Sequence, residues 1–391
     1  MGGEFKKMDI DVLIVGAGPA GLRMAKNTAD AGYRTLVLEK RRAIGEPVQC
    51  AGLVSSRVIS MTETEHAFDF PRKAVVISPL GNKLEIKTEM QKAAIINRSK
   101  FDKEMASKAV KAGARIELNC IVIDTTYDKI GGNRKIKYSK EGEQKTIDAK
   151  IVIGADGPSS IVRRSAGMCG PEEILSGVQA VVSSEDKSVK IHLGRDIAPS
   201  FFLYELPFKT GKLIGLASND GKAYQHLMKF LKKKGYNDKI ISFLSGTIPL
   251  GNLDQIVSDR LCLIGDAASQ VKPLSGGGIY FGLKGADICS EIVIDALNEN
   301  KISRRCLLEY QNKWNKQFGK QISKEMKIRK AFKKMDDKEI DDIIEILDRR
   351  KVRELIGKKG DMDNHSKLIP SLIKTSPELL KFTGTFFKTI F

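Results

Sequence analysis

Short runs of wholly apolar residues alternate, along much of the chain, with longer segments whose apolar positions recur at helical spacing. The first such unit is DVLIVGAGPAGLRMAKNTADAGYRTLVLEK, residues 11–40. Its run Val12 to Val15 has no polar position, which is typical of a parallel strand buried on both faces. The unit therefore predicts a strand, a glycine-rich turn, a helix over about residues 19–31 and a second strand over residues 35–38.

Two later segments repeat the order of apolar strand, glycine, aspartate and helix. AKIVIGADGPSSIVRRSAG, residues 149–167, has an apolar run over 151–153 that is followed by Asp156. DRLCLIGDAASQVKPLSGGGIYFGLK, residues 259–284, has an apolar run over 261–264, then Asp266, then three glycines that open a predicted helix. Both segments predict further buried strands, each ending at an aspartate.

Between these segments the apolar and polar residues alternate instead. KAVVISPLGNKLEIKT, residues 73–88, predicts a hairpin around Leu80, Gly81 and Asn82. Residues 178–194 and 200–218 alternate and turn like an antiparallel meander. We therefore predict an α/β (α+β) fold, in which a Rossmann-like domain (residues 1–72, 89–170 and 250–300) is interleaved with an antiparallel-sheet substrate domain (73–88 and 171–249).

The last part of the chain, residues 301–391, predicts a basic helical extension. In residues 338–356 the apolar positions 340, 343, 344, 347 and 355 recur on one face of a single helix, which we expect to pack on the body of the protein. Residues 366–391 hold apolar clusters broken by prolines and end in Phe386, Phe387, Ile390 and Phe391, with lysines between them. One half of this tail is expected to act as a lid and the other to lie at a membrane surface.

Composition narrows the class of protein. The hydrophobic fraction of 41% suits a water-soluble globular chain, and no apolar run approaches the roughly 18 residues of a membrane span. The N-terminus runs straight into a strand and does not read as a signal peptide. The six cysteines are scattered without a CxxC pair or a nearby histidine, so we expect no metal site and a reducing cytoplasm.

The net charge of +18 is uneven, since residues 301–391 contain 23 Lys and Arg against 13 Asp and Glu. Such a surface attracts nucleic acid, an acidic protein or phospholipid headgroups, although solvated lysine faces without a partner explain it equally well. Near the C-terminus the basic residues accompany exposed apolar ones. This combination favours peripheral contact with a membrane over binding of nucleic acid.

The glycine turn of the first unit carries the clearest chemistry. Gly16, Gly18 and Gly21 form G-x-G-x-x-G: the first permits the tight turn, the second lets the backbone approach a pyrophosphate, and the third lets helix pack on strand. Glu39 ends the second strand, 18 residues after Gly21, where a carboxylate can bind ribose hydroxyls. This unit predicts dinucleotide binding but leaves NAD and FAD open.

The later segments favour a flavin. An aspartate after the third strand, Asp266, suits the ribityl or pyrophosphate part of FAD. A helix opened by glycines can direct its positive dipole end at the pyrimidine side of the isoalloxazine and stabilise negative charge on the reduced ring. An enzyme that binds only NAD has no need of this third segment, so we predict FAD as the cofactor.

Over roughly residues 9–300 the chain resembles the aromatic-hydroxylase-like FAD-dependent oxidoreductases and, within them, the geranylgeranyl reductases. The resemblance rests on the three segments above, on EKRRAIGEPVQCAGLVS (39–55) and on INRSKFDKEMASKAVKAGA (96–114). It implies a Rossmann-like FAD-binding domain. With the glycine turn and the strand ends, the predicted FAD contacts are Gly16, Gly18, Ala20, Gly21, Glu39, Cys50, Ala51, Leu53, Arg98, Val122, Asp156, Asp266, Gly277, Gly278 and Ile279.

The family lines a prenyl pocket with a Tyr, a Trp and a Phe between two prolines. This chain has PSFFLYELP, residues 199–207, at the same spacing, so the resemblance assigns substrate contacts to Phe202, Tyr204 and Leu206. The aromatic residues differ from those of the family. The same three side chains would also form the inner face of a strand in a protein with another substrate.

Cys50 lies in GEPVQCAGL, at the place where the family carries a cysteine. Lone cysteines are usually buried and inert. Reduction of an isolated alkene, however, needs a hydride on one carbon and a proton on the other, and a thiol beside the flavin can deliver the proton. We therefore predict that Cys50 lines the active site as a candidate catalytic residue, where its thiol either delivers this proton or only shapes the pocket. His192 and His226 are expected to be ordinary surface or edge residues.

The resulting hypothesis is an FAD-dependent reductase that saturates geranylgeranyl chains of digeranylgeranylglycerophospholipids in archaeal membrane lipid synthesis. The expected reductant is external, either an acidic ferredoxin-like protein or NAD(P)H, because no second glycine fingerprint is present. We place the protein in the cytoplasm, at the inner face of the membrane. Two alternatives stay open: an FAD-dependent monooxygenase or oxidase acting on a hydrophobic small molecule, and a non-enzymatic FAD-containing lipid-binding protein.

Overall fold

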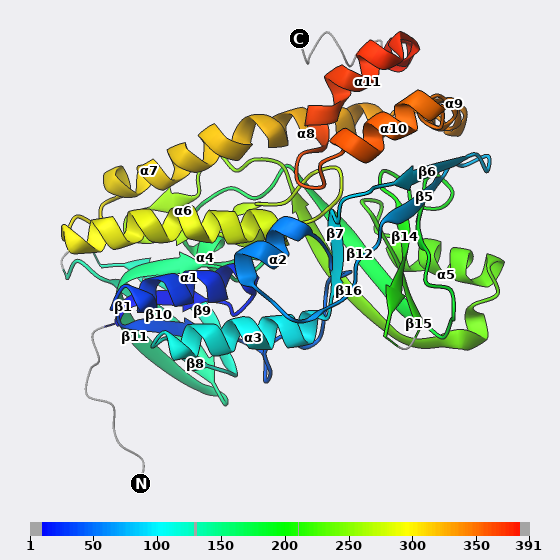
Figure 1. The fold of residues 1–391 in the computed structure, drawn as a ribbon. Helices are drawn as coiled ribbons and strands as arrows, with labels where there is room; N and C mark the ends of the chain where they lie inside the picture. Colours follow the sequence, from blue (N-terminus) through cyan, green and yellow to red (C-terminus); the bar gives the residue numbers. More distant parts are fainter. Residues whose placement is uncertain (1–9, 129–130, 210, 384–391) are drawn as a thin grey trace.

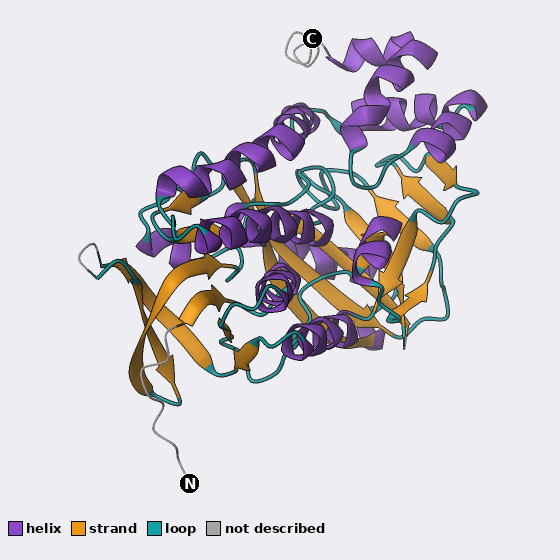
Figure 2. Ribbon diagram, turned by 60° about the vertical axis from the view of Figure 1, so that its left-hand side comes forward, coloured by secondary structure: helices purple, strands orange, loops and turns teal. Residues whose placement is uncertain are grey.

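A computed structural model describes residues 10–128, 131–209 and 211–383 of the chain. Its strands form an eight-stranded sheet, a seven-stranded sheet and a small three-stranded sheet. Figures 1 and 2 show long helices over the first sheet and a group of C-terminal helices beyond them. The mixed α/β class and the presence of two large sheets confirm the predicted fold class.

The eight-stranded sheet has the order β17-β18-β11-β1-β2-β8, and β9 and β10 extend β11 as an antiparallel ribbon. The pairs β1–β11, β1–β2, β2–β8 and β11–β18 are parallel. The strands are β1 (Ile10–Val15), β2 (Thr35–Leu38), β8 (Arg115–Glu117), β9 (Cys120–Tyr127), β10 (Arg134–Lys140), β11 (Glu143–Gly154), β17 (Val257–Ser258) and β18 (Leu261–Leu263).

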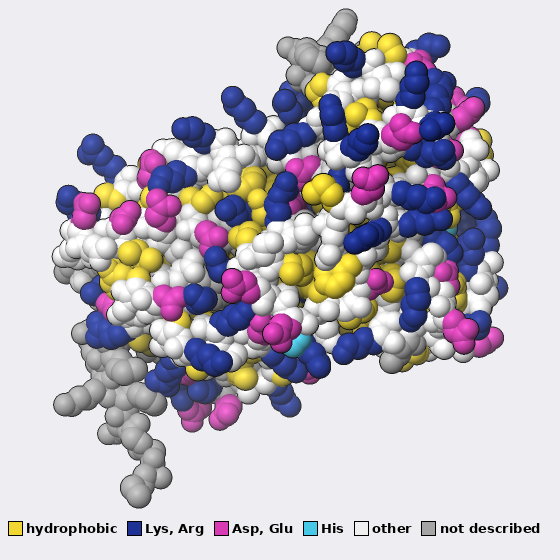
Figure 3. Space-filling model, viewed as in Figure 1, with side chains coloured by type: hydrophobic (Ala, Val, Ile, Leu, Met, Phe, Trp, Pro, Cys, Tyr) yellow, Lys and Arg dark blue, Asp and Glu magenta, His cyan; other side chains and the backbone are white. Residues whose placement is uncertain are grey.

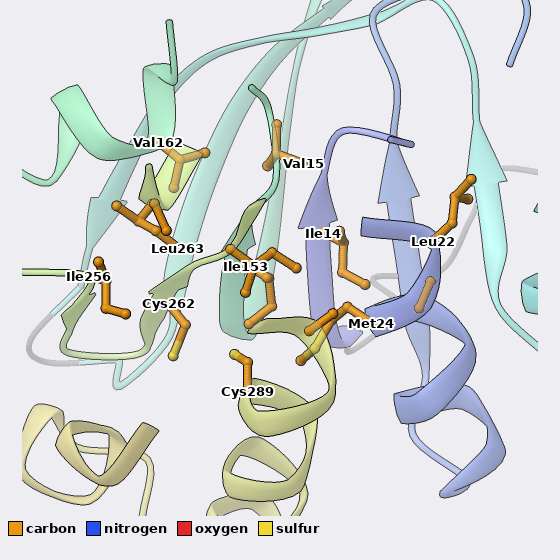
Figure 4. Close-up of a cluster of buried hydrophobic side chains, with 14 of the residues drawn as sticks. Ile14, Val15, Leu22, Met24, Ile153, Val162, Ile256, Cys262, Leu263 and Cys289 are labelled. Carbon is orange, nitrogen blue, oxygen red and sulfur yellow. The ribbon is translucent and has the colours of Figure 1, made fainter. Parts of the chain in front are cut away.

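The apolar runs of the sequence form the core of this sheet. Figure 4 shows Ile14 of β1 and Ile153 of β11 packed with Leu263 of β18, beside Met24 and Cys289 of the covering helices, and none of these side chains is exposed. The covering helices are α1 (Pro19–Asp30), α3 (Arg98–Lys111), α4 (Ile161–Ser165), α6 (Ile279–Asn298) and α7 (Arg304–Trp314). The prediction of buried parallel strands at these positions is confirmed.

The seven-stranded sheet has the order β16-β12-β15-β14-β13-β5-β6. Its members are β5 (Lys73–Ile77), β6 (Lys83–Lys87), β12 (Glu173–Val182), β13 (Val189–His192), β14 (Leu203–Phe208), β15 (Gly211–Ser218) and β16 (Ile240–Leu250). The predicted hairpin over 73–88 is present, and β5 pairs in parallel with β13, more than a hundred residues later in the chain. The chain therefore crosses between the two sheets repeatedly.

One face of this sheet is covered by α5 (Ala223–Lys233), whose Leu227 and Phe230 pack on β12 and β15. His192 lies under this helix and is only 3% exposed, so the expectation of a surface histidine is wrong. Its Nε2 lies 2.7 Å from the Glu205 Oε1 atom, and its ring packs edge-on against Phe230. His226 is partly exposed on α5, 2.7 Å from the Asp220 carboxylate.

The small sheet has the order β3-β7-β4, with strands β3 (Leu53–Ser55), β4 (Ala67–Asp69) and β7 (Ala93–Ile96), and α2 (Ser56–Thr62) follows β3. Beyond α7 the chain continues through α8 (Lys320–Phe332), α9 (Asp337–Leu347), α10 (Arg350–Lys359), the 3₁₀ helix η4 (His365–Leu368) and α11 (Ile369–Thr375). Among the described residues, none of the helices combines the length and the apolar character needed to cross a bilayer.

The prediction of one helix over residues 338–356 is wrong. Helix α9 ends at Leu347, Arg349 is extended (φ −61°, ψ 137°), and α10 starts anew at Arg350. Asp348 at the break accepts hydrogen bonds from the backbone N–H of Glu85 and from Arg353, which fixes the corner against β6. Helical periodicity alone does not show such a break. The predicted membrane-facing residues Phe386, Phe387, Ile390 and Phe391 lie outside the described residues.

Candidate active site

A cavity of about 1050 Å³ lies between the two large sheets. Its wall includes the glycine turn after β1, the ends of β2 and β11, the start of α6 and one face of the seven-stranded sheet. Every predicted site residue except Gly21 lines it: Gly16, Gly18, Ala20, Glu39, Cys50, Ala51, Leu53, Arg98, Val122, Asp156, Phe202, Tyr204, Leu206, Asp266, Gly277, Gly278 and Ile279. The structure thus brings the residues predicted for cofactor and for substrate together around one cavity.

The glycines of the turn have different roles. Gly16 has a φ of 103°, and a Cβ there would lie 2.4 Å from the Ala155 carbonyl oxygen. A Cβ on Gly21 would lie 2.1 Å from the Gly16 carbonyl oxygen, so Gly21 serves the packing of α1 on the turn. A Cβ on Gly18 would meet nothing within 4 Å. Gly18 therefore presents bare backbone to the cavity, directly before the N-terminus of α1.

Two predicted carboxylates also hold the turns in place. Glu39, only 8% exposed, accepts hydrogen bonds from the backbone N–H of Ala17 at 2.7 Å and of Arg41 at 2.9 Å. Asp156 accepts hydrogen bonds from the Ser160 hydroxyl at 2.6 Å and from the Ile161 N–H at 2.7 Å, and so fixes the start of α4. Each carboxylate lines the cavity while it braces the loop that forms its edge.

Asp266 lies between β18 and the glycines that precede α6. Burial raises the pKa of its carboxyl to about 6, and the positive charge of Arg98 only partly opposes this rise. A Cβ on Gly278 would lie 2.9 Å from the Asp266 Oδ1 atom, so a glycine is needed where the backbone passes this carboxyl. Helix α6 then begins at Ile279 with its N–H groups toward the cavity wall.

Cys50 is in contact with Arg98. The Arg98 guanidinium forms a bidentate ion pair with Asp102, at 3.1 and 2.9 Å, and also hydrogen-bonds the Cys50 thiol. Burial lowers the pKa of Arg98, but Asp102 and Cys50 outweigh this and raise it. Burial also raises the pKa of Tyr204, with a further contribution from Cys50. Cys50 therefore lies within electrostatic reach of both Arg98 and Tyr204, and all three side chains line the cavity.

The seven-stranded sheet supplies the apolar wall. Tyr204 and Leu206 lie on β14, while Phe202 precedes the strand and stacks on Phe201 with ring centroids 4.3 Å apart. The Tyr204 hydroxyl donates a hydrogen bond of 2.6 Å to the Gln179 side chain. Neighbouring strands add the apolar residues Val178, Val189, Ile191, Leu216 and Ile248 to the same wall.

Some lining residues were missed in the sequence. Lys272 lies in VKPLSGGG, directly before the glycines of α6, and its position beside that motif was the available signal. Met362, His365 and Leu368 come from the C-terminal region, where nothing in the local pattern connects them with the cavity. Their place depends on the packing of α10 and η4 against β6 and α8.

The arrangement fits FAD on grounds of its own geometry. The bare backbone at Gly18 and the N-terminus of α1 suit a pyrophosphate. Glu39 at the end of β2 suits a ribose, and the start of α6 suits the pyrimidine edge of an isoalloxazine. The apolar wall formed by Phe202 and Leu206 leaves the remaining part of the cavity for a hydrophobic molecule.

Comparisons with known proteins agree with this assignment. The FAD binding domain family matches residues 9–322. A digeranylgeranylglycerophospholipid reductase of Methanocaldococcus jannaschii is 30% identical over 389 residues, which cover 95% of this chain and 97% of the relative. An uncharacterised protein of the same organism is 32% identical over 382 residues, covering 94% and 95%. A geranylgeranyl bacteriochlorophyll reductase-like protein of Thermoplasma acidophilum has a solved structure with a TM-score of 0.84 and 23% identity, covering 95% and 97%.

The fold and the cavity define a flavin-dependent oxidoreductase with FAD as its cofactor. The chain belongs to the FAD binding domain family and, within it, to the geranylgeranyl reductases. The prediction of the family, of the cofactor and of an enzyme is confirmed. The individual site residues remain predictions, which the cavity makes specific enough to test.

Proposed function

We propose that the protein saturates the double bonds of geranylgeranyl chains in digeranylgeranylglycerophospholipid, as a step of archaeal membrane lipid synthesis. The observation that carries this proposal is the continuity of the cavity from the glycine turn to the apolar face of the seven-stranded sheet. Names of relatives with about 30% identity over nearly the full chain support the same substrate class.

The protein's own residues would divide the work as follows. Gly18, Glu39 and Asp266 would hold FAD, which supplies the hydride when bound and reduced. Phe202, Leu206 and their neighbours would exclude water and align the prenyl chain. Cys50, held by Arg98, would lie at the border between cofactor and chain. The site would thereby place successive double bonds at the same point.

The basic surface of the C-terminal helices supports contact with a membrane, from which the lipid substrate would enter. Lys351, Lys358 and Lys359 of α10 are exposed, and Leu380 is 43% exposed beyond them. Figure 3 shows Lys and Arg side chains over the C-terminal helices on this face. This region would rest on anionic headgroups at the inner face of the membrane, beside the cavity residues Met362, His365 and Leu368. The external reductant would be an acidic ferredoxin-like protein or NAD(P)H.

The test uses the full-length, flavin-loaded protein under strict anaerobiosis. Dithionite serves as reductant, digeranylgeranylglycerophospholipid as substrate, and mass spectrometry follows the lipid. We expect products that gain two hydrogens per saturated double bond, and a fully saturated analogue serves as the control. Lipid of unchanged mass beside a flavin that dithionite reduces would contradict the proposal. Uptake of oxygen with hydroxylation of an added hydrophobic compound would identify a monooxygenase instead.

A further inference from the structure

The C-terminal cap, residues 350–375, brings a histidine to the cavity. Met362, His365 and Leu368 of this cap line the cavity wall, so an imidazole lies between two apolar side chains. A polar side chain between apolar ones in a cavity wall needs a partner or a function. The alkene reduction proposed above requires one proton for each double bond, and His365 is an acid that lines the cavity.

One buried and one partly exposed ion pair hold this part of the cap beside the start of α6. The Lys272 Nζ atom lies 3.0 Å from the Asp363 Oδ1 atom and donates a hydrogen bond of 2.6 Å to the Met362 carbonyl oxygen. A Cβ on Gly277 would lie 2.8 Å from the Lys272 Cε atom. Arg57 of α2 also pairs with Asp363, with 3.1 Å between its Nη1 atom and the Asp363 Oδ2 atom. The segment that carries His365 is therefore fixed close to the predicted place of the isoalloxazine.

A fully buried carboxylate stands behind the histidine. Glu325 of α8 is 0% exposed, and its Oε1 atom accepts a hydrogen bond of 3.0 Å from the Gln321 side chain. The same oxygen lies 3.6 Å from the His365 Nδ1 atom. Within the described residues, Glu325 Oε2 and His365 Nδ1 are both buried without a hydrogen-bond partner. A small rotation of either side chain would join them, as catalytic hydrogen bonds often tighten only with substrate bound.

The orientation of the ring follows from its exposure. His365 Nδ1 is buried toward Glu325, whereas 33% of the side chain is exposed. Because Nδ1 is buried and His365 lines the cavity, Nε2 is the ring nitrogen left to face a bound substrate. A carboxylate behind one nitrogen of an imidazole fixes the tautomer and stabilises positive charge on the ring.

We propose that His365 is the proton donor of the alkene reduction and that Glu325 is its positioning residue. The inference rests on the proposed function. For each double bond, one carbon receives the hydride that the reduced flavin supplies, and the other carbon receives the proton of His365 Nε2. The carbon–carbon π bond breaks, two C–H bonds form, FAD is left oxidised, and His365 regains a proton from solvent.

The charged groups around His365 are few and defined. Glu325 faces it from α8, and Lys272 faces Asp363 from the loop before α6. Asp361, Asp363 and the exposed Lys367 lie on its own segment. Lys272 and both aspartates are engaged in ion pairs with one another or with Arg57. Glu325 is therefore the carboxylate placed to control the imidazole.

The test compares His365→Asn with His226→Asn, a matched control on α5. Both variants are loaded with FAD, reduced by dithionite without oxygen and mixed with digeranylgeranylglycerophospholipid. We expect reoxidation of the flavin by lipid to slow by about 10²-fold or more in His365→Asn alone. Reduction of the flavin by dithionite stays unchanged, and so does lipid binding, which is measured by equilibrium gel filtration. Added imidazole restores part of the reoxidation rate to His365→Ala, and the restored rate depends on the fraction of imidazole that is protonated.

Glu325 needs a readout that a purely structural role would not move. We expect Glu325→Gln to displace the pH profile of lipid-dependent reoxidation, and Glu325→Asp to restore it in part. Wild-type reoxidation rates in His365→Asn, or no rescue of His365→Ala by imidazole, would overturn the inference and leave the proposed function standing. If the flavin of the wild-type protein stays reduced in the presence of the lipid, that result contradicts the proposed function itself, on which the inference about His365 rests. Circular dichroism confirms that each variant is folded.

Discussion

Replacement of Gly18 by alanine separates cofactor binding from folding. The Cβ that Gly18→Ala introduces would meet no protein atom within 4 Å, and Gly18 has an ordinary φ of −76°. Loss of a glycine N-cap costs the flavin-free protein about 1 kcal/mol or less. The same methyl group would occupy the space of a pyrophosphate, so we expect FAD to bind at least about tenfold more weakly, equivalent to ~1.4 kcal/mol.

Gly16→Ala is the matched comparison, because there the clash is internal. Its Cβ would lie 2.4 Å from a carbonyl oxygen at a φ of 103°, so we expect a loss of about 3 kcal/mol or more in the flavin-free protein. Urea unfolding of the flavin-free variants gives the stabilities, and quenching of FAD fluorescence gives the affinities. Wild-type affinity in Gly18→Ala, with the flavin-free stability retained, would refute the assignment of the turn to the pyrophosphate.

Three further outcomes test the substrate sheet and Cys50. Lys212→Met should lower the free energy of unfolding by about 3–5 kcal/mol, because it removes a fully buried partner of Glu205, while exposed Lys209→Met should change little in the same urea titration. Burial would raise the pKa of Glu205, but hydrogen bonds from His192 and Lys212 lower it from 4.5 to about 2. The ionised carboxylate therefore stabilises the folded protein above pH 4.5, and this stabilisation is lost as the pH falls toward 2. A Glu205→Gln variant with the same acid unfolding curve as the wild type would contradict this. Cys50→Ala should raise KM for lipid while kcat stays within about threefold, and a fall in kcat of about 10²-fold would make the thiol the proton donor.

Local features of the chain were readable from the sequence. The strand, turn, helix and acid of residues 11–40 form a continuous unit whose period and glycines are set by neighbouring residues, and the structure has β1, α1 and β2 there. The hairpin of β5 and β6 was equally local, with Gly81 at a φ of 105°. Gly21 has the packing role that the motif predicts, because a Cβ there would lie 2.1 Å from the Gly16 carbonyl oxygen, but unlike the other residues predicted to contact FAD it does not line the cavity.

Features that depend on distant parts of the chain were not readable. His192 looked like an edge residue because alternation does not reveal that α5 covers the sheet and that Glu205 is opposite. The break at Arg349 arises from contacts between Asp348 and β6, which lies over 250 residues earlier. The same holds for His365, since only tertiary packing brings η4 between α8 and the cavity.

Stoichiometry of a single turnover tests the central claim most directly. The enzyme-bound flavin is reduced by one equivalent of dithionite, freed of excess reductant and mixed anaerobically with digeranylgeranylglycerophospholipid in a stopped-flow instrument. The account predicts full reoxidation of the flavin, with one double bond saturated per FAD in the recovered lipid. Reoxidation without a gain of two hydrogens, or a flavin that stays reduced beside intact lipid, would contradict it.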